Sequence, residues 1–118
     1  NTTVFPCYWN TRVTLHYNEK AIFRCRGANP MGANVAWNVK PNSDGEFTVA
    51  LFDQANFDAM SCGRPANCLN QDCNVGGSVI KYGSFHAQNA PAYYVVVTKT
   101  NNNWSGTSTY YVQASVTN

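Results

Sequence analysis

Hydrophobic and polar residues alternate along several short segments of this chain. Apolar side chains at every second position are the signature of a β-strand that buries one face. Four segments show this period: Arg12–Tyr17, Asn34–Lys40, Glu46–Phe52 and Thr107–Val116. The side chains predicted to face inward in the first three are Val13, Leu15, Tyr17, Val35, Trp37, Val39, Phe47, Val49 and Leu51. In the last segment, Tyr111 falls on the outward face.

Other segments are predicted as strands or turns from their composition. Ala21–Arg26 reads as a strand paired with 12–17 through a turn at Asn18-Glu19. Ala92–Lys99 is apolar on both faces, which is typical of a central, covered strand. Thr100–Gly106 is predicted as a hairpin loop, because it is rich in Asn and ends in Gly. The segment 53–61 fits either a turn or a short helix.

These elements predict one domain over residues 1–118. Seven to nine short strands with regular turn signals indicate an all-β fold, an antiparallel β-sandwich of jelly-roll or immunoglobulin-like type. The length of 118 residues is near the commonest domain size, so the chain can bury a real core. We expect less than about a fifth of the residues to be helical, below the share of an ordinary domain.

The five cysteines indicate a disulfide-stabilised protein of an oxidising compartment. Our preferred pairing is Cys7–Cys25 together with one bridge among Cys62, Cys68 and Cys73, which pins the irregular segment 62–77. The choice within these three stays open. An odd count leaves at least one thiol without an intramolecular partner, and in a secreted protein such a thiol often bonds to another chain.

The C-terminal part of the chain resembles a known secreted module. Tyr93 to Val97 reads Tyr-Tyr-Val-Val-Val and follows a loop that contains Cys62 and Cys73, over about the last seventy residues. This arrangement resembles the bacterial pre-peptidase C-terminal domain, which implies a sandwich fold. The acidic signature of those domains is not matched residue by residue, so no functional residue is carried over.

Composition and charge narrow the class of partner. Only 12% of the residues are charged and the net charge is +2 without a basic run, which argues against nucleic-acid binding. No segment reaches the roughly 18 apolar residues of a membrane span. The pattern N-x-[ST] makes Asn1 and Asn103 candidate glycosylation sites. Together with the cysteines, these features predict a secreted, extracellular protein.

Residues for catalysis or metal binding are few. His16 and His86 lie seventy residues apart in predicted strands, and His16 is expected to face solvent. Asp53 and Asp58 are weak candidates for Ca²⁺ or for a carboxylate pair, but Asp53 is better explained as the cap of the turn that follows it. We therefore predict no enzyme activity, no cofactor and no metal; a small secreted hydrolase is the least favoured alternative.

Aromatic residues in polar segments suggest binding. Trp9 and Trp104 lie among Asn, Thr and Ser, and Tyr111 faces outward, so these three are candidates for contact with a protein or a sugar. The favoured function is a structural or adhesive extracellular protein that binds itself or another protein. Self-assembly would use residues 1–8 as an edge or exchanged strand, or the odd cysteine. The alternative is a carbohydrate-binding module or lectin.

Overall fold

The computed structural model describes residues 3–7, 10–27, 30–42, 45–69, 75–102, 104 and 106–117. Asn1, Trp9, Cys73 and Asn103, named above as candidates, lie outside the described residues. The elements in chain order are β1 (Thr3–Pro6), β2 (Asn10–His16), β3 (Lys20–Arg26), β4 (Ala33–Pro41), β5 (Phe47–Asp53), α1 (Gln54–Ser61), β6 (Val75–Gly77), β7 (Lys81–Ala87), β8 (Ala92–Lys99) and β9 (Thr107–Thr117).

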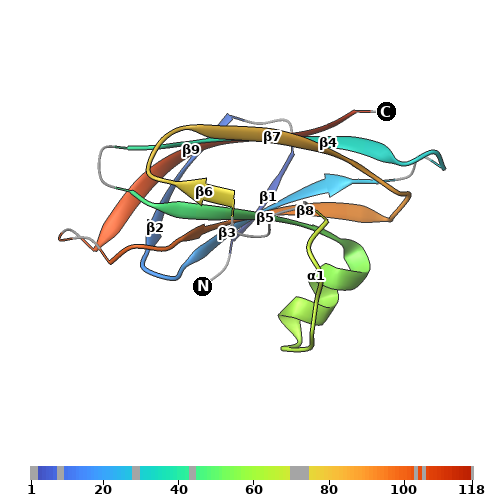
Figure 1. The fold of residues 1–118 in the computed structure, drawn as a ribbon, viewed down its shortest axis with the longest axis horizontal. Helices are drawn as coiled ribbons and strands as arrows, with labels where there is room; N and C mark the ends of the chain where they lie inside the picture. The colour runs from blue at the N-terminus through green and yellow to red at the C-terminus, as the bar shows by residue number, and fades with distance from the viewer. Residues whose placement is uncertain are drawn as a thin grey trace.

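The strands form two sheets packed face to face (Figure 1). One sheet has the order β1-β3-β8-β5-β6 and the other β2-β9-β4-β7. From β2 onward, every connection except β5 to β6 passes from one sheet to the other. This alternation, with β1 added at an edge, is the strand order of a jelly roll. The predicted all-β sandwich is confirmed, and of its two variants the topology is that of the jelly roll.

The core lies between the two sheets, where the alternating segments predicted it. Val35, Val39, Val49 and Leu51 are wholly buried, and Trp37 is nearly so. Strand β9 buries Ser108, Tyr110, Val112 and Ala114 and leaves Tyr111 exposed on the other face. The inward positions of β4, β5 and β9 are therefore confirmed.

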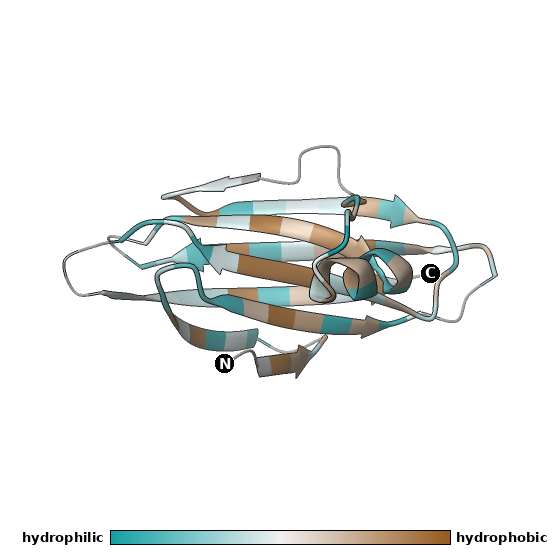
Figure 2. Cartoon of the chain, turned by 90° about the horizontal axis from the view of Figure 1, so that it is seen from below, coloured by the Kyte–Doolittle hydropathy of each residue, from teal (hydrophilic) through white to brown (hydrophobic). Residues whose placement is uncertain are grey.

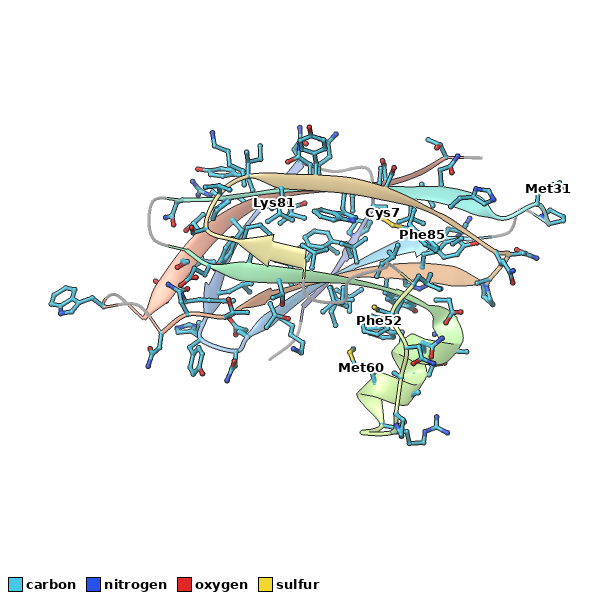
Figure 3. All side chains as sticks on the ribbon, in the orientation of Figure 1. Cys7, Met31, Phe52, Met60, Lys81 and Phe85 are labelled. Atoms are coloured by element: carbon cyan, nitrogen blue, oxygen red, sulfur yellow. A yellow bond between two sulfur atoms is a disulfide. The ribbon has the colours of Figure 1, made fainter. Side chains whose placement is uncertain are left out.

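Strand β8 is apolar on both faces because both faces are covered. It lies at the centre of the five-stranded sheet. On the side away from the core, α1 lies over this sheet (Figure 2), and Phe57 stacks on Tyr94 with ring centroids 3.8 Å apart. Figure 3 shows Phe52 on the sheet facing Met60 on the helix, and both belong to this second apolar cluster. The prediction of a central, covered strand is confirmed.

The segment 53–61 is resolved in favour of a helix. The Asp53 side chain caps α1 by accepting a hydrogen bond from the Asn56 backbone N–H at 2.9 Å, as the capping interpretation predicted. No residue of α1 is fully buried, which explains the weak hydrophobic periodicity of this segment. With eight residues, the helix in the described part of the chain stays far below a fifth of the protein.

Two predicted hairpins are wrong. Strands β2 and β3 belong to different sheets, where β2 pairs with β9 and β3 pairs with β8. The segment 100–106 likewise connects β8 to β9 across the sandwich rather than within one sheet. Tyr17 was predicted to face inward, but β2 ends at His16 and the Tyr17 side chain is half exposed. Short sequence separation suggested pairing, whereas the sandwich places consecutive strands in opposite layers.

The N-terminal strand is docked on its own sheet. β1 pairs in parallel with β3, and the Phe5 ring stacks on buried Phe23 with centroids 5.1 Å apart. The expected disulfide between Cys7 and Cys25 follows directly, with the two Cα atoms 5.0 Å apart. Since Phe5 packs against the core, removal of residues 1–6 is expected to destabilise the fold as well as remove an edge strand.

Candidate functional site: the outer face of the four-stranded sheet

The described residues do not form a catalytic pair of histidines. His16 and His86 lie on the same outer face but at opposite ends: His16 pairs with Thr107, and His86 lies across Asn34 from Thr117. Ten residues of β9 separate these positions, or about 33 Å at the rise of a strand. Proton transfer needs direct or single-water contact, so these histidines cannot act on one substrate atom together.

The two aspartates considered for Ca²⁺ have other partners. Asp53 caps α1, and Asp58 accepts a hydrogen bond from the Gln54 side chain at 2.9 Å. Among the residues that the structure describes, no group of three or more His, Cys, Asp or Glu side chains is placed to hold a metal ion.

The outer face of the four-stranded sheet gathers polar and aromatic side chains from four strands. The outward positions alternate with the buried ones, so the face is set by the same period as the core. Two rows cross its centre. In the first, Tyr111 of β9 lies between Arg12 of β2 and Lys40 of β4.

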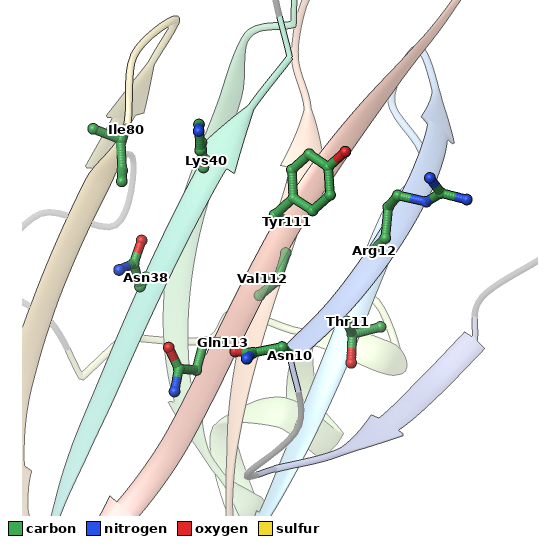
Figure 4. A pocket seen from close by; sticks show the side chains of 9 residues that line it. All are labelled: Asn10, Thr11, Arg12, Asn38, Lys40, Ile80, Tyr111, Val112 and Gln113. Carbon is green, nitrogen blue, oxygen red and sulfur yellow. The ribbon is translucent and has the colours of Figure 1, made fainter.

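In the second row, Gln113 lies between Asn10 and Asn38, and Tyr82 of β7 is the next neighbour of Asn38. Figure 4 shows Lys40, Tyr111 and Arg12 in one row across three strands, with Gln113 in the other row. The central face therefore carries two cations, two tyrosines and three amides.

These central side chains have no partner within the described part of the protein. Neither an ion pair nor a side-chain hydrogen bond engages Arg12 or Lys40 there. The ends of the face differ. Thr14 bonds Thr109 at 3.2 Å, and the His86 ring bonds Asn34 at 3.0 Å. The hydrogen-bonding groups at the centre are thus available to a ligand, whereas those toward the ends are partly satisfied by their neighbours.

Two shallow hollows follow the central rows. The first, of about 510 Å³, is lined by Arg12, Lys40, Tyr111 and Ile80 among others. The second, of about 530 Å³, is lined by Tyr82 and Ser84 among others, and both include Asn38 and Gln113. Each lies within the size range of small-ligand sites. Because they share Asn38 and Gln113, the two hollows adjoin, and we call the pair the groove.

The floor of the second hollow depends on a glycine. Gly83 pairs with Trp37 across β4 and β7. A Cβ atom at Gly83 would lie 2.8 Å from Cζ2 of Trp37, closer than normal packing allows. The glycine therefore leaves the space that the indole ring occupies between the sheets. Trp37 supports the groove from beneath and is only 6% exposed.

Sequence reasoning identified one residue of this site. Tyr111 is half exposed and lines the first hollow. Trp104 is fully exposed, but it lies before β9, whose first residue, Thr107, is already about 13 Å of strand from Tyr111 by the residue rise. Arg12, Lys40 and Tyr82 were missed as site residues. Their outward positions could be read from the alternation, but their proximity depends on the strand order.

A second polar cluster closes one end of the sandwich. Lys99 is wholly buried, and its Nζ donates to Asn101 Oδ1 at 2.7 Å and to Ser108 Oγ at 2.8 Å. Asn101 also accepts from the Glu46 backbone N–H, and the Tyr110 hydroxyl donates to the Glu46 carbonyl. These hydrogen bonds join the two sheets and satisfy a buried cation, so the cluster is structural.

Three cysteines remain beside the Cys7–Cys25 bridge. Cys62 is a free, exposed thiol at the C-terminal end of α1. Cys68 is disulfide-bonded. At least one bridge therefore involves the segment that was expected to need one, and the prediction of an unpaired thiol applies to Cys62.

The comparisons with known proteins identify the fold. No family model matches the chain, and no curated protein sequence matches it. The pre-peptidase C-terminal domain of collagenase from Bacillus anthracis superposes with a TM-score of 0.54 at 15% identity, over 97% of this chain and 94% of that one.

Periplasmic inhibitors of g-type lysozyme, PliG, give similar values. The Salmonella Typhimurium protein has a TM-score of 0.57 at 12% identity, over 97% of this chain and 98% of that one. The Aeromonas hydrophila protein has a TM-score of 0.56 at 11% identity, over 98% of this chain and 97% of that one. Among the described residues, no helix has the length and apolarity to cross a membrane. At these identities, the likeness shows the fold alone: the chain shares a β-sandwich architecture with these domains.

Proposed function

We propose that this chain is a non-enzymatic binding module of an extracellular or periplasmic space, and that it binds another protein through the outer face of the four-stranded sheet. The observation that carries the proposal is the central face itself. Its tyrosines, cations and amides line two adjoining hollows, and their side chains have no partner within the described part of the chain.

The composition of this face favours a protein partner. Tyr and Arg are enriched at protein interfaces and at their energetic centres. Tyr82 and Tyr111 are 78% and 50% exposed, and Ile80 beside them is 50% exposed. Large apolar groups next to unsatisfied amides provide both buried area and directional hydrogen bonds. Two of the similar folds are inhibitors of lysozyme, which is a role that depends on binding a protein.

The compartment is inferred from the cysteines. Cys7 and Cys25 form a disulfide and Cys68 takes part in another, and such bonds persist in oxidising environments. The glycosylation candidates and self-assembly through residues 1–8 remain sequence-based predictions.

Selection from a displayed library tests the proposed face. Random peptides displayed on phage are panned against the disulfide-intact protein, and enriched clones are compared on two double variants. Tyr82→Ala with Tyr111→Ala removes the aromatic groups of the face. The matched control, Tyr17→Ala with Trp104→Ala, removes two exposed aromatics elsewhere. We expect most clones to lose binding to the first variant and to keep binding to the control. Clones that lose binding only to the control would refute the proposed face.

A carbohydrate is the second candidate ligand, because one observation favours it. Tyr82 is more exposed than Tyr111 and lies beside Asn38, with Gln113 one strand further along the same row. In this arrangement a ring can stack on a sugar while amides bond its hydroxyls. Binding to a neutral oligosaccharide array that is lost with Tyr82→Ala, without enrichment of peptides, would select this candidate instead.

A further inference from the structure

The charged residues in the strands of the four-stranded sheet are all basic. Strands β2, β4, β7 and β9 contain Arg12, Lys40 and Lys81 and no Asp or Glu. Of the described acidic residues, Glu46 lies at a loop of one end, and Asp53 and Asp58 lie at the helix. Glu19 follows β2 and lines a separate hollow at the sheet edge with Arg12, but its hydrogen bonds and its ion pair go to His16. Arg12 and Lys40 are exposed and make no ion pair with any described residue. The central face therefore carries positive charge that the described part of the chain does not neutralise.

The two cations have a defined spacing. Arg12 and Lys40 occupy the same row on β2 and β4, with Tyr111 of β9 between them. Neighbouring strands are about 4.8 Å apart, so the two Cα atoms are separated by about 10 Å. In an extended peptide, side chains two residues apart point the same way and lie about 7 Å apart. The long Arg and Lys side chains can reach two such groups on either side of the tyrosine ring.

We infer that the partner segment on this face is acidic and extended, with carboxylates that contact Arg12 and Lys40 on either side of Tyr111. The inference rests on the proposed function, because it names the chemistry of the partner at the same site. The Arg12 guanidinium can hold a carboxylate through two parallel hydrogen bonds. Lys40 supplies a point charge, and the amides of Asn10, Asn38 and Gln113 can bond the backbone of the segment.

Complementary charge at this site is expected to favour association with acidic segments and to discriminate against basic ones. Both cations are exposed to solvent, so each contact contributes modestly and is screened by salt. A segment with Lys or Arg at the same positions is repelled, which excludes basic partners. The pair of cations is too small a footprint for a nucleic acid, whose phosphate backbone requires a larger cluster.

Two synthetic peptides test the inference directly. One is an acetylated and amidated octapeptide of alternating Glu and Ser, and the other has Gln in place of every Glu. Each is titrated into the 15N-labelled, disulfide-intact protein, and amide shifts give both the affinity and the position of binding. We expect the Glu peptide to shift residues around Arg12, Lys40 and Tyr111, and to bind at least about fivefold more tightly than the Gln peptide.

Charge-neutralising variants locate the effect. Arg12→Gln and Lys40→Gln should each weaken binding of the Glu peptide by about fivefold. Arg26→Gln is the matched control, since it removes an exposed cation from β3 in the other sheet and should leave the affinity unchanged. Raising NaCl from about 50 to about 500 mM should weaken the Glu peptide and not the Gln peptide. The unbound spectrum of each variant reports that it is folded.

The outcomes separate this inference from the proposed function. Equal affinity of the two peptides at the central face would refute the inference that the partner segment is acidic, and would leave the face as a binding site. Equal losses for Arg12→Gln and Arg26→Gln would also overturn it, because the attraction would then follow net charge alone. Tighter binding of a galacturonic acid tetramer than of the Glu peptide would assign the site to an acidic glycan, against a protein segment. Library clones that bind elsewhere, as above, would refute the proposed face itself.

Discussion

Replacing Gly83 with alanine tests the packing beneath the proposed groove. Gly83 faces Trp37 across the β4–β7 pair, and its backbone is outside the left-handed region. Alanine is therefore compatible with the backbone at this position. The added methyl carbon would lie 2.8 Å from Cζ2 and 3.1 Å from Cε2 of the Trp37 ring. A ring that is only 6% exposed has little room to move away.

The structure predicts both the sign and the size of the change in stability caused by Gly83→Ala. Without the tryptophan, alanine in a strand would stabilise the protein by about 0.5–1 kcal/mol relative to glycine, since it loses less backbone entropy on folding. Overpacking a core costs about 1–3 kcal/mol. The expected net loss is therefore about 1.2 kcal/mol at the midpoints of the two ranges, and at most about 2.5 kcal/mol. At about 2.1 cal/mol/K per residue, a chain of 118 residues has an unfolding entropy near 0.25 kcal/mol/K. The Tm should then fall by about 5 °C, and by no more than about 10 °C.

Thermal and urea unfolding of wild type and variant measure this change. Ser84→Ala, at the exposed neighbouring position of β7, is the control and should stay within about 0.5 kcal/mol of wild type. Trp37→Phe should reduce the cost of Gly83→Ala, because the two residues are in contact and their effects couple. A rise in Tm for Gly83→Ala would refute the reasoning, since it would mean that the indole ring does not lie against the glycine.

Three further predictions concern other parts of the chain. The Glu19 carboxylate accepts a hydrogen bond from the His16 backbone N–H at 3.0 Å, and this bond holds the pKa of Glu19 below its ordinary value of 4.5. The stabilisation is thus complete above that value and is lost as the pH falls through the lowered pKa. The Tm of Glu19→Gln should therefore lie below that of wild type at pH 7, and the two Tm values should converge as acid protonates Glu19; a gap of constant size throughout the acid titration would contradict this. Trp104→Ala should leave the Tm within a few degrees, as its side chain is fully exposed; a large loss on thermal unfolding would place Trp104 in the core. Peptide mapping without reduction should find Cys62 outside any intramolecular bridge and Cys68 within one; a Cys62–Cys68 bridge would contradict the assignment.

The sandwich could be predicted because its strands have one face on the core. In β4 the residues Val35, Trp37 and Val39 alternate with polar neighbours, and the structure buries all three. Strand pairing could not be predicted in the same way. β2 and β3 are separated by a short turn and look like a hairpin. Each instead forms its backbone hydrogen bonds with a strand distant in sequence: β2 with β9, and β3 with β8. Nothing local distinguishes a turn within a sheet from one between sheets.

The candidate site was only partly predictable for the same reason. Tyr111 was identified because its outward position follows from alternation in β9 alone. Arg12, Lys40 and Tyr82 come from three other strands and meet only through the order β2-β9-β4-β7. Trp104 was singled out for its polar neighbours, and it lies at a loop rather than in the groove. Alternation along a strand indicates which residues are exposed, whereas the strand order decides which of them lie close together.

Binding through the central face is tested most directly by the amide shifts that a selected peptide causes in the 15N-labelled protein. The largest shifts should follow the outward positions of β2, β9 and β4, centred on Tyr111 and Gln113, with little change in α1 or around Trp104. Shifts concentrated on α1 and the segment 62–69, or on the loops at either end of the sandwich, would contradict the proposed binding face.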